Sequence, residues 1–178
     1  AQIEEFRHQI EEDPDNCVHH YNLGEALAEL GQLEEAQEAF EQALLLDENQ
    51  AFSAIIHFGI GNLYYHQLMS GIQSTVVKSS VGLHSQHRAG NTISSVNDDD
   101  YSIPLREFEA AMQDIPSLQA DEEIMEYISQ NVPQQIATVY YKWASDLFDK
   151  ARQIDNYGDE VKDIKDKAEA MRAYAKQA

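Results

Sequence analysis

Between Asn22 and Asn49 the apolar residues follow the spacing of an amphipathic helix, twice in succession. Apolar or small residues recur at intervals of three and four, at Leu23, Gly24, Leu27, Leu33, Ala36, Phe40, Ala43 and Leu44. Such spacing places the residues of each half on one helical face. Gly31 separates the halves, and a turn this short makes the second helix fold back on the first. We therefore predict an antiparallel helical hairpin over 17–50, with Asn16 as the cap of its first helix.

This hairpin resembles the tetratricopeptide repeat, a helical hairpin with a period of about 34 residues. With Cys17 as the first position, the motif of that family is matched by Leu23, Gly24, Leu27, Gly31, Ala36, Phe40 and Ala43. Gly24 and Ala36 are small where two helices have to approach closely. The sequence departs from the motif at His20, where tryptophan is usual, and at Glu48, where proline is usual.

The same period extends toward the N-terminus. One period before Phe40 and Leu44 stand Phe6 and Ile10, and a closing proline follows as Pro14. Residues 1–14 are therefore interpreted as the second helix of an earlier repeat whose first helix is missing. We expect the chain to begin inside a repeat.

Toward the C-terminus the next repeat is interrupted. A first helix is expected over 54–68 and its second helix over 101–116, where Phe108, Ala111 and Pro116 have the spacing of Phe40, Ala43 and Glu48. Residues 69–100 between them are rich in serine and predict an inserted loop, and loops this long are often functional. The insertion ends in Asp98–Asp100, and Asp100 or Ser102 is the expected cap of the helix that follows.

Residues 118–178 keep a helical pattern without the repeat motif. Leu118–Gln130 is a short amphipathic segment, and Pro133 is expected to break or start a helix. Two apolar stripes follow, at Ile136, Tyr140, Trp143, Leu147, Ala151 and Ile154, and then at Val161, Ile164, Ala168, Met171 and Ala175. The expected fold is thus a single all-α domain over 1–178. The resemblance implies antiparallel hairpins stacked in a right-handed superhelix, closed by a C-terminal capping helix.

Charge narrows the classes of partner. The chain carries 32 acidic and 12 basic residues, a formal charge of −20. Residues 1–141 hold 24 of the acidic residues and only 4 basic ones, whereas the rest is balanced. Such a surface repels phosphate backbones and anionic lipids, so we expect neither nucleic acid nor membrane as a ligand. A basic protein partner is favoured, although acidity can also serve solubility alone.

The resemblance implies a function in protein binding. In that family the first helices line a concave groove that holds a peptide or helix of a partner, and carrying its positions over gives Val18, Tyr21, Asn22, Glu25, Ile55, Phe58, Asn62, Tyr65 and His66 as groove residues. Any one of them could equally pack against a neighbouring helix. Binding to the acidic tail of a chaperone is disfavoured, because neither first helix contributes lysine or arginine to such a groove.

Two further functions stay open beside this scaffold or adaptor. One is an acidic chaperone or escort for a basic client such as a histone-like protein. The other is an assembly module that self-associates through the edge left by the incomplete repeat.

Catalytic and metal-binding patterns are weak. Glu5 and His8 have the spacing of a di-iron pair without the further ligands that such a site needs. His84 and His87 have no completing carboxylate or cysteine pattern, and Cys17 has no orienting partner for nucleophilic chemistry. We therefore expect no enzyme, no cofactor and no metal. A single cysteine and the lack of a long apolar run favour a cytoplasmic location.

Overall fold

The computed structural model describes the backbone of residues 2–82, 96–153 and 159–178, and in these ranges it contains helices and turns without a β-strand. The all-α fold class expected from the sequence is confirmed. The helices are α1 (Gln2–Glu12), α2 (Cys17–Glu29), α3 (Leu33–Leu46), α4 (Ser53–Gly82), α6 (Asp99–Asp114), α7 (Glu122–Gln153) and α8 (Asp159–Gln177). Two 3-10 turns, Glu48–Gln50 and Ile115–Ser117, precede α4 and follow α6.

The single domain expected over 1–178 divides into two compact units. The first comprises residues 1–64 and 106–133, and the second comprises residues 65–105 and 134–178. The helices α4, α6 and α7 each contribute one part to either unit.

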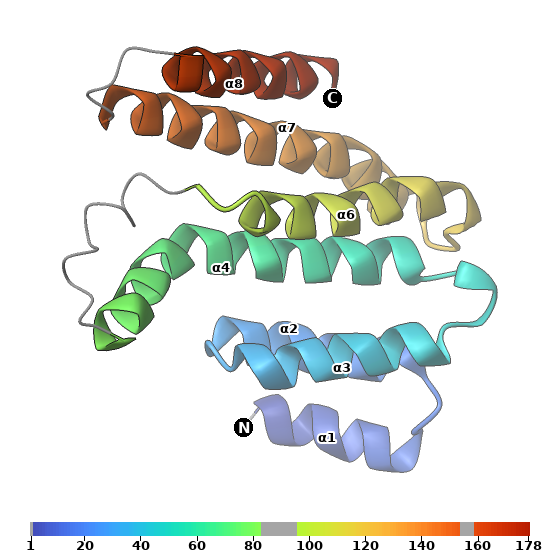
Figure 1. Ribbon diagram of the computed structural model, residues 1–178. Helices are drawn as coiled ribbons and strands as arrows, with labels where there is room; N and C mark the ends of the chain where they lie inside the picture. The colour runs from blue at the N-terminus through green and yellow to red at the C-terminus, as the bar shows by residue number, and fades with distance from the viewer. Residues whose placement is uncertain (1, 83–95, 154–158) are drawn as a thin grey trace. The chain divides into compact units, whose positions relative to one another are not determined.

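The hairpin of α2 and α3 belongs to the first unit. The two helices run antiparallel (Figure 1), and Asn16 caps α2 as expected, because its side-chain oxygen accepts a hydrogen bond of 3.0 Å from the Val18 N–H. Gly31 takes the left-handed φ of +79° at the turn. Leu27, Ala36 and Phe40 are at most 1 % exposed and form the core of this hairpin.

The repeat motif positions the helices through glycines. A Cβ atom on Gly24 would lie 2.7 Å from the Phe40 ring, so only glycine lets α2 approach α3 this closely. In the interrupted repeat a Cβ on Gly61 would lie 2.6 Å from the Phe108 ring. Glycine on the first helix and phenylalanine on the second therefore pack alike in both repeats.

Polar contacts join the ends of α4 and α6. Ser53 donates a hydrogen bond of 2.8 Å to Asp114, and the His57 ring lies 2.9 Å from Glu107. The Gln119 N–H donates to the Ala51 carbonyl at 2.8 Å. Residues 53–64 and 106–114 thus form a second hairpin, although the insertion separates its helices in the sequence.

The helices differ from the expected ones at three places. First, α4 continues to Gly82, so the first part of the segment 69–100 is helical, because extending a formed helix adds one hydrogen bond for each residue fixed. Residues 83–95 of that segment lie outside the described residues. Second, α6 starts at Asp99, whose N–H donates to the Asn97 side chain, and not at Asp100 or Ser102.

The third difference concerns Pro133, which neither breaks nor starts a helix but lies inside α7. The proline cannot donate a backbone hydrogen bond to Ser129, whose side chain is exposed. Ile128 and Val132, which are 2 % and 0 % exposed, form the buried face of α7 in the turns just before the proline. Burial on this face therefore holds the helix together across it.

The second unit contains the two apolar stripes of the C-terminal region. Trp143, Leu147 and Ala151 of α7 are buried, as are Ala168 and Ala175 of α8. The Trp143 ring stacks nearly parallel to the rings of Tyr101 and Tyr140, with interplanar angles of 7° and 4°. Ile154 lies outside the described residues.

Candidate functional site

One face of α2 gathers the residues that the sequence predicts for the first part of the site. Val18, Tyr21, Asn22 and Glu25 follow one another at intervals of three and four residues and therefore share a helical face. Val18 and Glu25 are exposed, whereas Tyr21 and Asn22 are partly buried. This face offers an apolar, an aromatic and an acidic group to solvent within two turns of helix.

Tyr21 is held in place from three sides. Its ring packs against Phe40 at 5.7 Å between centroids and edge-on against Phe52 at 5.3 Å. A Cβ on Gly59 would lie 3.2 Å from the Tyr21 ring, so a glycine of α4 leaves room for it. Burial raises the pKa of the Tyr21 phenol well above its ordinary range, and the charge of Glu25 and a hydrogen bond to Glu25 add to this rise. The phenol therefore stays protonated as a donor to Glu25.

The predicted residues on α4 are placed differently. Ile55 and Phe58 are each only 7 % exposed, and Phe58 packs against Phe108 and Tyr127 at 5.9 Å and 6.2 Å between centroids. These two side chains belong to the core of the first unit. Asn62 is partly buried. The surface contacts expected from Ile55 and Phe58 are therefore not available in this structure.

The start of α7 contributes two residues that the sequence did not single out. Tyr127 is 55 % exposed and meets Phe58 edge-on, and Ile124, one turn earlier, is 41 % exposed. The charge of Tyr127 makes the smallest of the four contributions that raise the pKa of Tyr21. We call Tyr21, Phe58 and Tyr127 the aromatic cluster. The sequence pattern of Leu118–Gln130 indicates only an amphipathic segment, because the repeat motif does not extend to it.

Tyr65 and His66, the last two predicted residues, belong to the second unit. Tyr65 is partly buried. Burial raises the pKa of its phenol, and the nearby charge of Asp146 raises this pKa further. Asp146 also accepts a hydrogen bond of 2.5 Å from Tyr101 and pairs with Lys142 at 3.1 Å. His66 is exposed. The predicted groove residues are thus divided between the two units.

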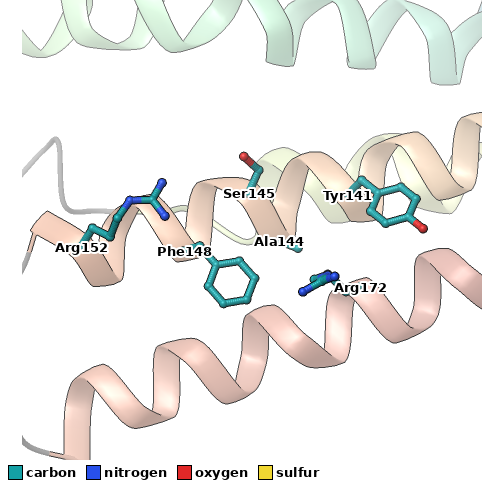
Figure 2. A pocket seen from close by; sticks show the side chains of 6 residues that line it. All are labelled: Tyr141, Ala144, Ser145, Phe148, Arg152 and Arg172. Carbon is teal, nitrogen blue, oxygen red and sulfur yellow. The ribbon is translucent and has the colours of Figure 1, made fainter.

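A cavity of about 310 Å³ lies between α7 and α8 in the second unit. Figure 2 shows the Phe148 ring projecting from α7 and the Arg172 side chain projecting from α8 into the space between the helices. The lining residues are Tyr141, Ala144, Ser145, Phe148, Arg152 and Arg172. No sequence pattern predicts this cavity, because its residues come from two helices without a recognised motif.

The residues with catalytic or metal-binding potential have other partners. His8 pairs with Glu12 at 3.1 Å and His19 with Asp13 at 3.4 Å. Burial raises the pKa of the Cys17 thiol, and the charge of Asp47 adds to this, which opposes the thiolate needed for a nucleophile. His84 and His87 lie outside the described residues. Within the described part of the chain, no cluster of three or more potential ligands could hold a metal ion.

The two units differ in charge. The first unit carries 21 acidic residues against Arg7 and Arg106, a formal −19, whereas the second carries 11 acidic and 10 basic residues. Almost the entire negative charge of the protein therefore belongs to the unit that contains the aromatic cluster. None of the described helices is both long and apolar enough to span a membrane.

Comparison with known proteins identifies the hairpin. The tetratricopeptide repeat model matches residues 20–50, which cover most of α2, all of α3 and the turn after it. No curated protein and no solved structure matches the chain. Repeats of this family generally mediate protein–protein interaction, and the family is typically non-enzymatic. The packing of glycine against phenylalanine in two successive hairpins agrees with this match, and the hairpin of α2 and α3 is a helical repeat of the tetratricopeptide type.

Proposed function

We propose that the protein is a non-enzymatic scaffold that binds a partner peptide or helix through the first unit, at the surface formed by α2 and the start of α7. The observation that carries the proposal is the exposure of Tyr127 and Ile124 beside a buried aromatic support. Exposed aromatic side chains on a rigid base are frequent anchors in protein interfaces. Tyr21 and Glu25 supply a polar group on the exposed face of α2.

The expected partner segment has apolar side chains and a basic group. Apolar side chains would bury Tyr127 and Ile124, and a lysine or arginine would face Glu25. The formal −19 of the first unit favours a basic segment over an acidic one at any approach to this surface. Asn22 lies on the same face of α2 and has both a donor and an acceptor for a peptide backbone.

The test compares Tyr127→Ala with Tyr174→Ala in a pull-down from lysate at low and high salt. Tyr174 is a matched control, because it is 48 % exposed and lies on α8, in the second unit. Partners are identified by mass spectrometry, and their affinity is then measured with purified protein. The expected partner stays bound at high salt and loses about tenfold or more in affinity on Tyr127→Ala. Equal binding by both variants would contradict the proposal.

A second function is favoured by the charge of the first unit alone. An escort for a basic client would bind through its 21 acidic residues without a particular anchor. Such binding weakens steeply as salt screens the charges. Basic proteins released at high salt, and captured equally by both tyrosine variants, would support this escort function over the scaffold.

A further inference from the structure

Two arginines line the cavity between α7 and α8, in a protein that has few of them. The whole chain contains five arginines, and Arg152 of α7 and Arg172 of α8 both line this cavity. Among the described residues of the same unit, some lysines also form ion pairs, but with acidic residues away from the cavity. These pairs are Lys142–Asp146, Lys162–Asp166 and Lys167–Asp98. The planar guanidinium group, unlike an ammonium group, can hold a carboxylate through two parallel hydrogen bonds.

Both arginines retain donors for a ligand. Arg152 binds Asp149 and Arg172 approaches Glu169 at 3.6 Å, each partner being three residues away on the same helix. The side chains of both pairs are 45–70 % exposed, and exposed pairs of this kind are worth little. A guanidinium has five N–H groups, so one local partner leaves several of them available. An incoming carboxylate therefore competes with weak contacts.

The other walls are suited to an apolar side chain. Ala144 is 2 % exposed and lies at the floor, while the partly buried Phe148 ring forms one side (Figure 2). Tyr141 and Ser145 are exposed and add hydroxyl groups. A cavity of about 310 Å³ is at the small end for ligand sites. It has room for one or two side chains of a ligand, and not for a folded partner.

We propose that this cavity binds a short acidic segment of a partner protein, in which a carboxylate contacts Arg152 and Arg172 and a neighbouring apolar side chain lies on Phe148. A single carboxylate can bind here because the second unit is nearly neutral, and charges more than about 8 Å away are largely screened at physiological salt. The site shares no residue with the aromatic cluster, so either proposal can fail without the other.

The experiment titrates the ¹⁵N-labelled full chain with a capped pentapeptide that carries phenylalanine between two acidic residues. A second peptide has asparagine and glutamine in place of the acids. We expect the acidic peptide to shift the amide signals of Ala144, Phe148 and Arg172, and the neutral peptide to leave them unchanged at the same concentration. Arg152→Gln and Arg172→Gln should each weaken binding about tenfold, since hydrogen bonds to charged groups are lost.

Arg106→Gln is the matched control, because it removes the same charge from an exposed arginine of the first unit. It should change the affinity by less than about twofold. Equal weakening by Arg106→Gln, equal binding of the neutral peptide, or no localised shift at millimolar peptide would overturn the proposal. Arg172→Lys retains the charge without the planar group and should weaken binding less than Arg172→Gln. Sedimentation velocity tests whether the protein self-associates. If it does, and if Arg172→Gln abolishes the self-association, the ligand of the cavity is a second copy of the chain and the proposal of a partner peptide is overturned.

Discussion

The phenol of Tyr101 illustrates how a single residue couples burial to charge. The side chain is 3 % exposed, stacks on Trp143 and donates a hydrogen bond to the Asp146 carboxylate. Burial raises its pKa well above the ordinary range, and the hydrogen bond and the charge of Asp146 act in the same direction. Burial likewise raises the pKa of Tyr21, which belongs to the first unit. Both phenols hold their protons while the protein is folded.

We expect stability to fall at alkaline pH because of these phenols. A folded pKa above the unfolded value of about 10 means that the native state retains the proton, so this contribution to stability is full below pH 10 and is lost as the pH rises further. Tyr101→Phe should lower the free energy of unfolding by about 1–2 kcal/mol at neutral pH and make the alkaline decline shallower. Urea unfolding across a pH series measures both effects. Tyr174→Phe, at an exposed site, is the control and should change little.

Single residues also show which parts of the candidate site the sequence could predict and which it could not. The resemblance to the repeat family implied Val18, Tyr21 and Glu25 as groove residues, and their spacing places them on one face of α2. The carried-over positions could not distinguish the surface from the core for Ile55 and Phe58, because the burial of these two residues depends on other helices. Tyr127 was missed for the same reason, since its contact with Phe58 joins residues far apart in the sequence.

At the scale of helices, the approach of glycine to phenylalanine is the feature that the two hairpins share. Gly24 meets Phe40 within 16 residues of sequence, whereas Gly61 meets Phe108 across the insertion. Both rings are at most 1 % exposed, so neither can move away without disturbing the core. The close contact is therefore a constraint on the interhelical distance in both repeats.

Gly24→Val and Gly61→Val should each destabilise the protein, by about 2–3 kcal/mol, because the added methyl groups overlap a buried ring. Similar losses would indicate that the interrupted repeat carries as much packing energy as the continuous one. Urea unfolding followed by circular dichroism gives the comparison. Glu38→Val on the exposed face of α3 is the control and should cost less than about 1 kcal/mol. A neutral Gly61→Val would contradict the equivalence of the two hairpins.

The helix boundaries show which elements the sequence could define. A hairpin whose packing partners are adjacent in sequence was recognised with its cap at Asn16, because all its determinants are local. The prediction that Pro133 breaks or starts a helix was wrong, because the burial of neighbours such as Val132 outweighs the loss of one backbone hydrogen bond. The cavity between α7 and α8 could not be predicted at all, because Arg152 and Arg172 share no local pattern.

At the scale of the whole molecule, the charge is carried almost entirely by one of the two units. The first unit has a formal −19, and like charges within one compact body repel one another. The second unit, with 11 acidic and 10 basic residues, has little such repulsion. From the sequence alone, this uneven distribution of charge could be seen only as an acidic part before residue 142. The two units themselves could not be recognised, because their residues alternate along the chain.

Salt should therefore stabilise the protein. The urea midpoint should rise between low salt and about half-molar sodium chloride, because screening removes repulsion within the first unit. The double variant Glu29→Lys/Glu38→Lys reverses two exposed charges of that unit and should show a smaller rise. Lys162→Glu/Lys176→Glu, on α8, is the counterpart in the second unit and should not reduce the response. A salt response that is the same in all three proteins would show that the charge of the first unit does not limit stability.

The stack of Tyr101, Trp143 and Tyr140 has an optical consequence. Trp143 is the only tryptophan of the chain, is 8 % exposed and belongs to the second unit. Its fluorescence at a long excitation wavelength therefore comes from one half of the molecule, without any label. Emission from this buried indole should lie to the blue and move to the red when the second unit opens. The protein thus contains its own reporter, with which opening of the near-neutral half can be followed separately from that of the acidic half.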